Sequence, residues 1–218
     1  MDRVHVKICC IQSVEEAALA LELGADALGL VSAMPSGPGV ISEAEIARIT
    51  AALPEADTFL LTRLQDVEAL AAQQQRTGVR TVQLCDRLPD GAVQELRRRL
   101  PHVRWVPVIH IAGETSVAEA VAAAVGAHAL LLDSGRPSAP VPELGGTGRT
   151  HDWEVSARIR TAVSVPVYLA GGLNPANVGA AIRRVRPFGV DVCSGVRVQG
   201  RLDRELLTRF MAAVREAE

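Results

Sequence analysis

The chain has few aromatic residues. Phenylalanine, tyrosine and tryptophan make up 3% of the sequence, although 48% of it is hydrophobic. Alanine, valine and leucine must therefore fill the core. This composition favours helices packed on a parallel sheet, because parallel strands are buried on both faces and are rich in branched aliphatic residues.

Long hydrophobic runs, an excess of one charge and closely spaced cysteines are also missing. No apolar stretch approaches the ~18 residues of a membrane-spanning helix, and the N-terminus lacks the apolar region of a signal peptide. The net charge of -2, without a long basic run, argues against nucleic acid or a membrane as partner. Four cysteines do not make a secreted disulfide scaffold. We therefore predict a cytoplasmic, reduced protein.

Short apolar runs alternate with helical patterns along the whole chain. The predicted strands are residues 4–8, 27–30, 57–61, 81–84, 104–109, 129–132, 167–170 and 189–192. The predicted helices are residues 14–23, 42–52, 66–76, 91–100, 116–125, 153–162, 177–185 and 203–216. A chain that repeats strand then helix in this way builds a parallel sheet.

The first turn favours a barrel over an open sheet. An open, doubly wound sheet usually has a glycine-rich turn after its first strand, whereas residues 9–12 read CCIQ. We therefore predict an α/β fold, a single (β/α)₈ TIM barrel over residues 1–218, with no second domain.

Local signals mark the ends of the helices. Ser42 and Glu45 form a capping-box signature at the start of the second helix. Four glycines lie between a helix and the next strand, where glycine ends helices; they are Gly24, Gly78, Gly126 and Gly189.

Two ionisable side chains stand at the ends of predicted strands. Cys9 follows the apolar run 4–8, and Asp133 follows the run 129–132. In a barrel of this kind, the carboxyl ends of the strands meet at the mouth where the chemistry takes place. A thiol and a carboxylate facing one cavity are a candidate base and acid. The structural alternatives are a small buried hydrophobe for the cysteine and a turn residue for the aspartate.

Small-residue turns follow the last two predicted strands. Residues 170–174 read AGGLN, and residues 191–196 read DVCSGV. Glycines let the backbone approach an anion, and barrels often bind phosphate after their last two strands. We therefore predict a phosphorylated small molecule as ligand, bound by Gly171, Gly172, Asn174, Asp191, Ser194 and Gly195.

Two loops after strands are longer than the others. They span residues 31–41 and 134–152 and are rich in glycine and proline. Long loops on one face of a barrel are where binding and gating take place. His151 lies in the second loop, and we expect it at the surface.

Motifs over the whole chain resemble one family. They are Lys7-Ile8-Cys9 with residues 20–29 (ALELGADALG), Gly145–Gly148 (GGTG) with Asp152-Trp153, residues 170–175 (AGGLNP), and residues 185–191 (VRPFGVD) with Ser194-Gly195-Val196. In combination they resemble phosphoribosylanthranilate isomerase.

The resemblance implies a (β/α)₈ barrel that performs an Amadori rearrangement of N-(5-phosphoribosyl)anthranilate in tryptophan biosynthesis. This aldose–ketose isomerisation needs no metal or organic cofactor. By resemblance, Cys9 is the general base, Asp133 is the general acid, and Lys7 and Gly146 belong to the substrate-binding residues. Lys7 lies on the strand face of Cys9, where a cation favours the thiolate. The composition leaves open whether the protein is a monomer or a homodimer.

The chain departs from the family pattern where the anthranilate group binds. Gly39 stands in place of the arginine that holds the anthranilate carboxylate. A glycine cannot replace an arginine–carboxylate fork. Either Arg63 or Arg87 supplies the charge, or the aglycone is different. Two other hypotheses follow, an isomerase of another phosphoribosyl-amine and a non-catalytic barrel that binds a phosphorylated metabolite.

Other positions depart as well. Cys10 and Gln12 replace a glycine and a threonine, Cys85 replaces the histidine after the fourth strand, and Arg197 replaces a glutamate after the eighth.

The cysteines suggest a competing hypothesis. Cys9, Cys10, Cys85, Cys193 and His110 all fall at the carboxyl ends of predicted strands, as zinc ligands would. The first and fourth strands are well separated around a barrel, however, so one ion cannot use all of them. We therefore predict no metal.

Overall fold

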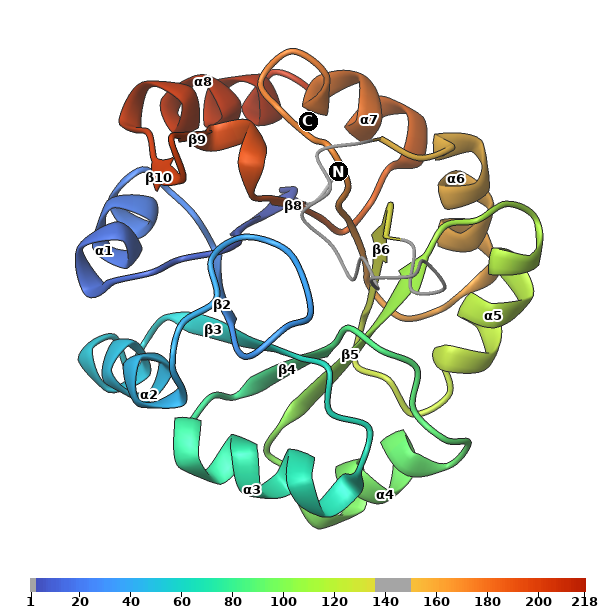
Figure 1. The fold of residues 1–218 in the computed structure, drawn as a ribbon. Helices are drawn as coiled ribbons and strands as arrows, with labels where there is room; N and C mark the ends of the chain where they lie inside the picture. Colours follow the sequence, from blue (N-terminus) through green and yellow to red (C-terminus); the bar gives the residue numbers. More distant parts are fainter. Residues whose placement is uncertain (1–2, 136–149) are drawn as a thin grey trace.

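Eight parallel strands close into a ring at the centre of the protein (Figure 1). The computed structural model describes residues 3–135 and 150–218. Its barrel strands are β1 (His5–Ile8), β2 (Ala27–Val31), β3 (Asp57–Thr62), β4 (Thr81–Leu84), β5 (Arg104–His110), β6 (Leu130–Asp133), β7 (Val167–Leu169) and β8 (Gly189–Val192). Each pairs with the next along the chain, and β8 pairs with β1. The predicted TIM barrel is confirmed.

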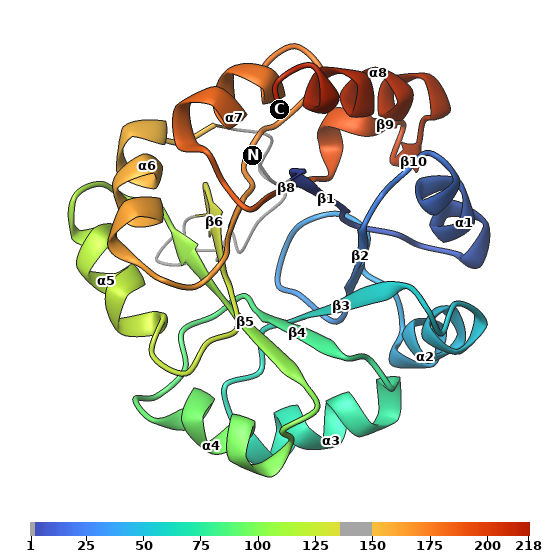
Figure 2. The same ribbon diagram turned by 180° about the vertical axis from the view of Figure 1, so that it is seen from behind.

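Helices surround the ring on its outer side (Figures 1 and 2). They are α1 (Val14–Glu22), α2 (Glu43–Ala52), α3 (Val67–Thr77), α4 (Ala92–Arg99), α5 (Thr115–Ala123), α6 (Trp153–Ala162), α7 (Val178–Val185) and α8 (Arg204–Arg215). Between β8 and α8 the chain adds three short elements that the alternation did not predict. These are the 3-10 helix η1 (Ser194–Val196) and an antiparallel hairpin, β9 (Arg197–Val198) and β10 (Arg201–Leu202).

The helix ends follow the local signals, with one exception. The Ser42 hydroxyl accepts a hydrogen bond from the Glu45 N–H at 3.1 Å, as the capping box predicts. Gly24, Gly78 and Gly126 have positive φ angles after their helices. The prediction for Gly189 is wrong, because this residue lies in β8. A Cβ at Gly189 would lie 2.6 Å from the Tyr168 ring, so the glycine makes room for that side chain.

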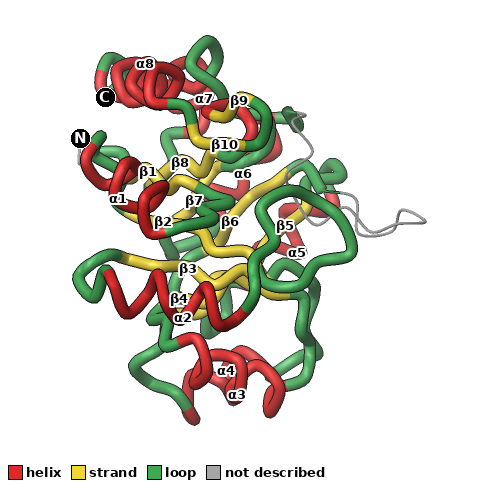
Figure 3. Tube along the Cα trace, turned by 60° about the vertical axis from the view of Figure 1, so that its left-hand side comes forward, coloured by secondary structure: helices red, strands yellow, loops and turns green. Residues whose placement is uncertain are grey.

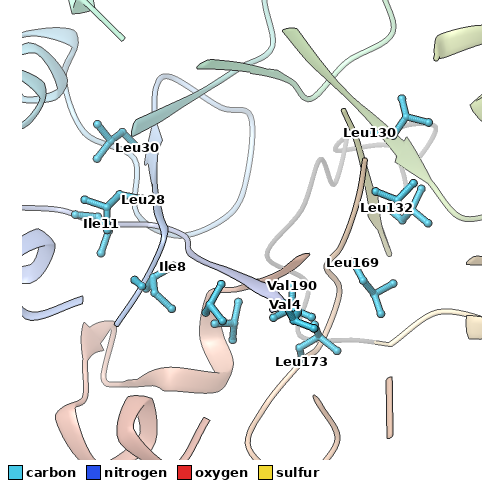
Figure 4. Packing of buried hydrophobic residues seen from close by; sticks show 14 of the residues in the cluster. Val4, Ile8, Ile11, Leu28, Leu30, Leu130, Leu132, Leu169, Leu173 and Val190 are labelled. Carbon is cyan, nitrogen blue, oxygen red and sulfur yellow. The ribbon is translucent and has the colours of Figure 1, made fainter. Parts of the chain in front are cut away.

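Both faces of the strands are packed against apolar side chains, which explains why the strands read as continuous apolar runs. One face packs against the helices; it includes the labelled side chains Ile8, Leu28, Leu30, Leu132 and Leu169 of Figure 4. The alternate residues form a second cluster inside the barrel, including Phe59, Leu61, Val106, Leu131 and Tyr168. The interior is therefore a packed core.

A buried ion pair joins the first strand to the last. The register of β1 and β8 sets Lys7 beside Asp191, and Nζ lies 2.9 Å from Oδ1. The Lys7 side chain is 0% exposed and that of Asp191 is 7% exposed. Burial opposes the charge of Lys7, but Asp191 and the nearby Cys9 outweigh it and raise the pKa of the ammonium above its ordinary value. The barrel therefore closes around a charged pair, and removing either partner would leave the other charge buried and uncompensated.

Replacing one partner tests this dependence. Lys7→Met leaves Asp191 buried without a counter-ion, and we expect it to lower the free energy of unfolding by about 3–5 kcal/mol. Lys7→Met/Asp191→Leu removes both charges and is expected to recover most of the loss. Guanidinium unfolding of the three proteins measures both effects. A double variant as unstable as the single one would contradict this account.

Candidate active site

A cavity opens at the carboxyl ends of the strands, on the side where the loops that follow the strands extend (Figure 3). It encloses about 680 Å³ including its open mouth. Six of the predicted site residues line it, namely Cys9, Asp133, Gly171, Gly172, Asp191 and Ser194. Three others do not line it, namely Lys7, Asn174 and Gly195. Gly146 lies outside the described residues.

Cys9 extends the ladder of β1 by one residue and faces the interior of the barrel. Its N–H donates to the Val192 carbonyl at 2.8 Å, and the residue is 6% exposed. A Cβ at Gly29 on β2 would lie 2.9 Å from the Cys9 Sγ and 3.0 Å from the Lys7 Nζ. The glycine thus leaves room for a thiol and an ammonium side by side, and Lys7 shares the face of Cys9 as predicted.

Asp133 is the last residue of β6 and is buried at 7% exposure. Its Oδ1 accepts a hydrogen bond from the Ser134 N–H at 2.7 Å. Burial raises the pKa of the Asp133 carboxyl, and the Ser134 N–H and His110, its register neighbour on β5, oppose that rise. A carboxyl whose pKa is raised keeps its proton to a higher pH and is suited to donate it.

The turn after β7 and the 3-10 helix η1 together form one corner of the cavity. Gly171 and Gly172 have φ angles of +82° and +63°. A Cβ at Gly195 would overlap the Leu173 carbonyl, so only glycine lets η1 approach the turn after β7 this closely. In the part of the chain that the structure describes, the N–H groups of Gly171, Gly172, Ser194 and Gly195 have no acceptor. Free N–H groups on adjacent turns are typical of an anion site.

Asn174 stabilises the turn at this corner through its hydrogen bonds. Its side-chain oxygen accepts from the Ala176 N–H at 2.9 Å, and its own N–H donates to Asn177 Oδ1 at 2.8 Å. The side chain of Asn174 is therefore engaged in holding the turn that carries the two glycines.

Gln83 on β4 was missed by sequence reasoning, whereas Cys85, just after that strand, was considered only as a metal ligand. Gln83 and Cys85 lie two residues apart and both line the cavity. Gln83 is 3% exposed, and its Oε1 has no hydrogen-bond partner among residues 3–135 and 150–218. Burial raises the pKa of the Cys85 thiol, which stays neutral. A glutamine between apolar residues of a short strand was the available signal.

His151 is half-buried, and the expectation that it lies at the surface is wrong. Its Nε2 lies 2.7 Å from the Ser156 hydroxyl. Burial lowers the pKa of its imidazole to about 4, so the ring is neutral at physiological pH. A Cβ at Gly171 would lie 3.0 Å from its Nδ1 and 3.2 Å from Asp133 Oδ1, which places the histidine on the Asp133 side of the cavity.

The thiols of Cys10 and Cys193 meet at the mouth of the cavity. Their Sγ atoms are 2.6 Å apart, and both cysteines are free. Cys10 has a φ angle of +63°, which a residue with a side chain rarely adopts. Within the described ranges, no group of three or more His, Cys, Asp or Glu residues converges as metal ligands.

The loop after β2 packs against Cys10. Gly39 has a φ angle of +78°, and a Cβ there would lie 2.5 Å from the Cys10 Cβ and 2.9 Å from its Cα. The backbone and the side chain of Cys10 together therefore leave no room for a side chain at position 39. Neither Arg63 nor Arg87 lines the cavity, and Arg87 lies 3.8 Å from Asp90 at the surface.

Comparisons with known proteins agree with this geometry. Residues 6–213 match the family model described as N-(5'phosphoribosyl)anthranilate (PRA) isomerase. A protein of that name from Pseudomonas fluorescens is 36% identical over 224 residues, covering 100% of this chain and 98% of the relative.

Solved structures give the same result. The phosphoribosyl anthranilate isomerase of Thermotoga maritima superposes with a TM-score of 0.84 and 30% identity, covering 98% of this chain and 99% of the other. Another isomerase structure, in complex with reduced 1-(o-carboxyphenylamino)-1-deoxyribulose 5-phosphate, has a TM-score of 0.81 and 28% identity and covers 98% and 99% of the two chains.

The environment of Asp133 predicts a pH-dependent stability effect. Folding raises the pKa of its carboxyl above the unfolded value of 3.8. The folded state is therefore penalised as the pH rises above that value and the penalty vanishes below it. We expect Asp133→Asn, which keeps an acceptor for the Ser134 N–H, to raise the free energy of unfolding at pH 7. The gain is roughly 1.4 kcal/mol for each unit of that pKa shift. Urea unfolding at pH 7 and near pH 4 checks it, and an equal gain at both pH values would refute the cause.

The contact of Cys10 with Gly39 predicts a coupled pair of substitutions. Gly39→Ala adds a Cβ that overlaps Cys10 and strains φ, and we expect a loss of about 2–3 kcal/mol in the free energy of unfolding. In a Cys10→Gly background the overlap with the Cys10 Cβ is gone, while the 2.9 Å approach to the Cα of residue 10 and the strain in φ remain, so we expect a smaller loss. Gly91→Ala is the matched control, because Gly91 has a φ of +84° and open space around its Cβ position. A double-mutant cycle by chemical unfolding that shows no coupling would contradict the contact.

Proposed function

The chain belongs to the phosphoribosylanthranilate isomerase family, and we propose that Cys9 and Asp133 are the base and the acid of its reaction. The protein is an isomerase that performs the Amadori rearrangement of N-(5'-phosphoribosyl)anthranilate in tryptophan biosynthesis. The observation that carries the role assignment is a buried thiol and a buried carboxyl, from β1 and β6, on one cavity.

Ring opening is the step that we assign to Asp133. Its neutral carboxyl gives a proton to the ring oxygen of the ribose while the bond from that oxygen to C1 breaks. The lone pair of the substrate nitrogen forms a C=N double bond, so the sugar becomes an open-chain iminium. The raised pKa of the Asp133 carboxyl supports this role, because it favours the protonated form before the step.

Proton removal from C2 is the step that we assign to Cys9. The iminium acidifies this proton, the thiolate takes it, and the electron pair of the C–H bond moves toward nitrogen to give an enolamine. The enolamine then tautomerises to the ketose. Cys9 ends protonated and Asp133 ionised, so a proton passes from the thiol to the carboxylate, through solvent, before the next turnover. The ammonium of Lys7 lies beside this thiol, with Gly29 leaving room for both groups.

We assign the phosphate of the substrate to the corner made by Gly171, Gly172, Ser194 and Gly195, whose free N–H groups support anion binding. Asn174 supports that site as the residue that holds the turn. Lys7 and Asp191 lie deeper, and we propose that they stabilise the Cys9 side of the cavity. Gly146 stays a proposed substrate contact from the family resemblance.

One observation favours a broader substrate range. The β2–α2 loop contributes Met34, Ser36, Gly37 and Pro38 to the described cavity wall, and none of them is charged. This supports turnover of phosphoribosyl-amines whose aglycone lacks a carboxylate. Comparing kcat/KM for the anthranilate and aniline derivatives tests it, and a large preference for anthranilate would count against the broader range.

We further propose a cytoplasmic enzyme of one domain, a monomer or homodimer, that uses no metal or organic cofactor and binds no nucleic acid. The four free cysteines support a reducing compartment. Among the helices that the structure describes, none has the length and hydrophobicity needed to cross a membrane.

Removing either catalytic group tests the proposed function. We expect Cys9→Ala and Asp133→Asn each to lower kcat by about 10²–10⁴-fold, as the loss of a general base or acid does. Neither variant should rescue a tryptophan auxotroph that lacks the isomerase, whereas the wild type should. Asp57→Asn is the carboxylate control, because Asp57 pairs with Arg104 at the opposite end of the barrel. An active Cys9→Ala protein would refute the assignment of the base.

A further inference from the structure

Arg197 is a charged residue buried beside the active-site mouth without lining the cavity. It is the first residue of β9, and its side chain is 4% exposed. Its counter-ion is Glu16 on α1, which is 17% exposed and lies 3.1 Å from the guanidinium. Burying an ion pair has a substantial desolvation cost, so its position calls for an explanation beyond stability.

The guanidinium holds the backbone that carries the proposed base. Its Nη2 donates to the Cys9 carbonyl at 3.1 Å and to the Cys10 carbonyl at 2.6 Å. Among the described residues, neither carbonyl has another donor. Cys10 holds a left-handed conformation that is unfavourable for a residue with a side chain. The bonds from Arg197 therefore stabilise the turn at the point where the backbone is strained.

Glu16 and the β9–β10 hairpin fix the guanidinium in turn. Glu16 also accepts from the N–H groups of Gln12 at 3.1 Å and Leu202 at 3.0 Å. The Gly200 carbonyl accepts from Arg197 Nη1 at 3.0 Å and from Gln12 Nε2 at 3.1 Å. The hairpin and the turn after β1 thus form one hydrogen-bonded unit, although they are far apart in the sequence.

We propose that Arg197 is a positioning residue of the isomerase, which aims the Cys9 thiol at the substrate by fixing the peptide groups on either side of Cys10. The inference rests on the role of Cys9 as base proposed above. A thiol that must remove a proton from carbon needs its sulfur held within a fraction of an ångström, since such reactions are sensitive to small misplacements. The Cys9 carbonyl is bonded to the Cα that carries the thiol, so a hydrogen bond to it restrains the position of the sulfur.

A second ion pair between the same helix and the same region offers a matched control. Arg204 on α8 pairs with Glu22 on α1 through two contacts of 2.9 Å. The side chains are 57% and 60% exposed, and neither contacts the turn after β1. Arg204→Met therefore removes an arginine–glutamate pair without touching the backbone of Cys9.

Steady-state kinetics separate a positioning role from a structural one. We expect Arg197→Met to lower kcat by about 10–100-fold while KM stays within about threefold, because the phosphate corner is intact. Calorimetry with reduced 1-(o-carboxyphenylamino)-1-deoxyribulose 5-phosphate counts the sites that bind ligand. The kcat is expressed per such site, so that misfolded protein does not lower it. Arg197→Lys should recover part of kcat, and Arg204→Met should equal the wild type. A normal kcat per site in Arg197→Met would overturn the proposal.

Two further measurements cover the remaining outcomes. If Arg197→Met does not fold, Glu16→Gln takes its place, because it keeps the guanidinium but removes the negative charge that pairs with it. A kcat per site equal to that of the wild type would then overturn the proposal. Hydrogen exchange of the peptide with residues 5–13 needs no substrate. It should be faster in Arg197→Met than in Arg204→Met, and equal rates would overturn the proposal. If the wild type does not turn over the substrate but the exchange rates differ, the proposed function fails while the control of the turn stands.

Discussion

The buried pair of Lys7 and Asp191 is the interaction on which the rest of this barrel depends. It joins β1 to β8, the pair of strands that closes the ring, and the register of these strands sets the two charges side by side. The same ammonium lies beside the Cys9 thiol, with Gly29 leaving room for both. The pair that joins the first strand to the last therefore also places a cation beside the proposed base. An apolar pair would close the barrel at lower cost, but it would leave the thiol without a neighbouring cation.

Asp133 and Cys9, the proposed acid and base, lie in different environments. Burial raises the pKa of the Asp133 carboxyl above its ordinary value, while the Ser134 N–H and His110 oppose that rise. Cys9 instead lies beside a fixed positive charge. One rigid cavity thus holds a carboxyl with a raised pKa and a thiol beside a cation. The difference follows from position on the barrel, because Asp133 is buried at the end of β6 and Cys9 follows the strand that carries Lys7.

The order of strands and helices was predictable because each element carries its own period and its own end signals. Cys9, Asp133 and the glycine turns could be placed for the same reason, since a parallel barrel brings all strand ends to one mouth. Arg197, Gln83 and His151 could not be assigned in this way. The contacts of Arg197 join residues more than 180 positions apart in the sequence. Each strand of the hairpin that carries Arg197 has only two residues, too few for a recognisable strand pattern. The burial of Gln83 and His151 depends on side chains that meet only after closure.

The contact between Cys10 and Gly39 has a consequence for how this sequence can change over generations. Gly39 lies against the Cα of Cys10 as well as its Cβ, so the second loop passes too close to the first for any side chain at position 39. A longer residue there requires the second loop to move away from residue 10, whichever residue stands at that position. A charged contact from this loop therefore needs a change in the path of the backbone, which a single substitution at position 39 does not supply.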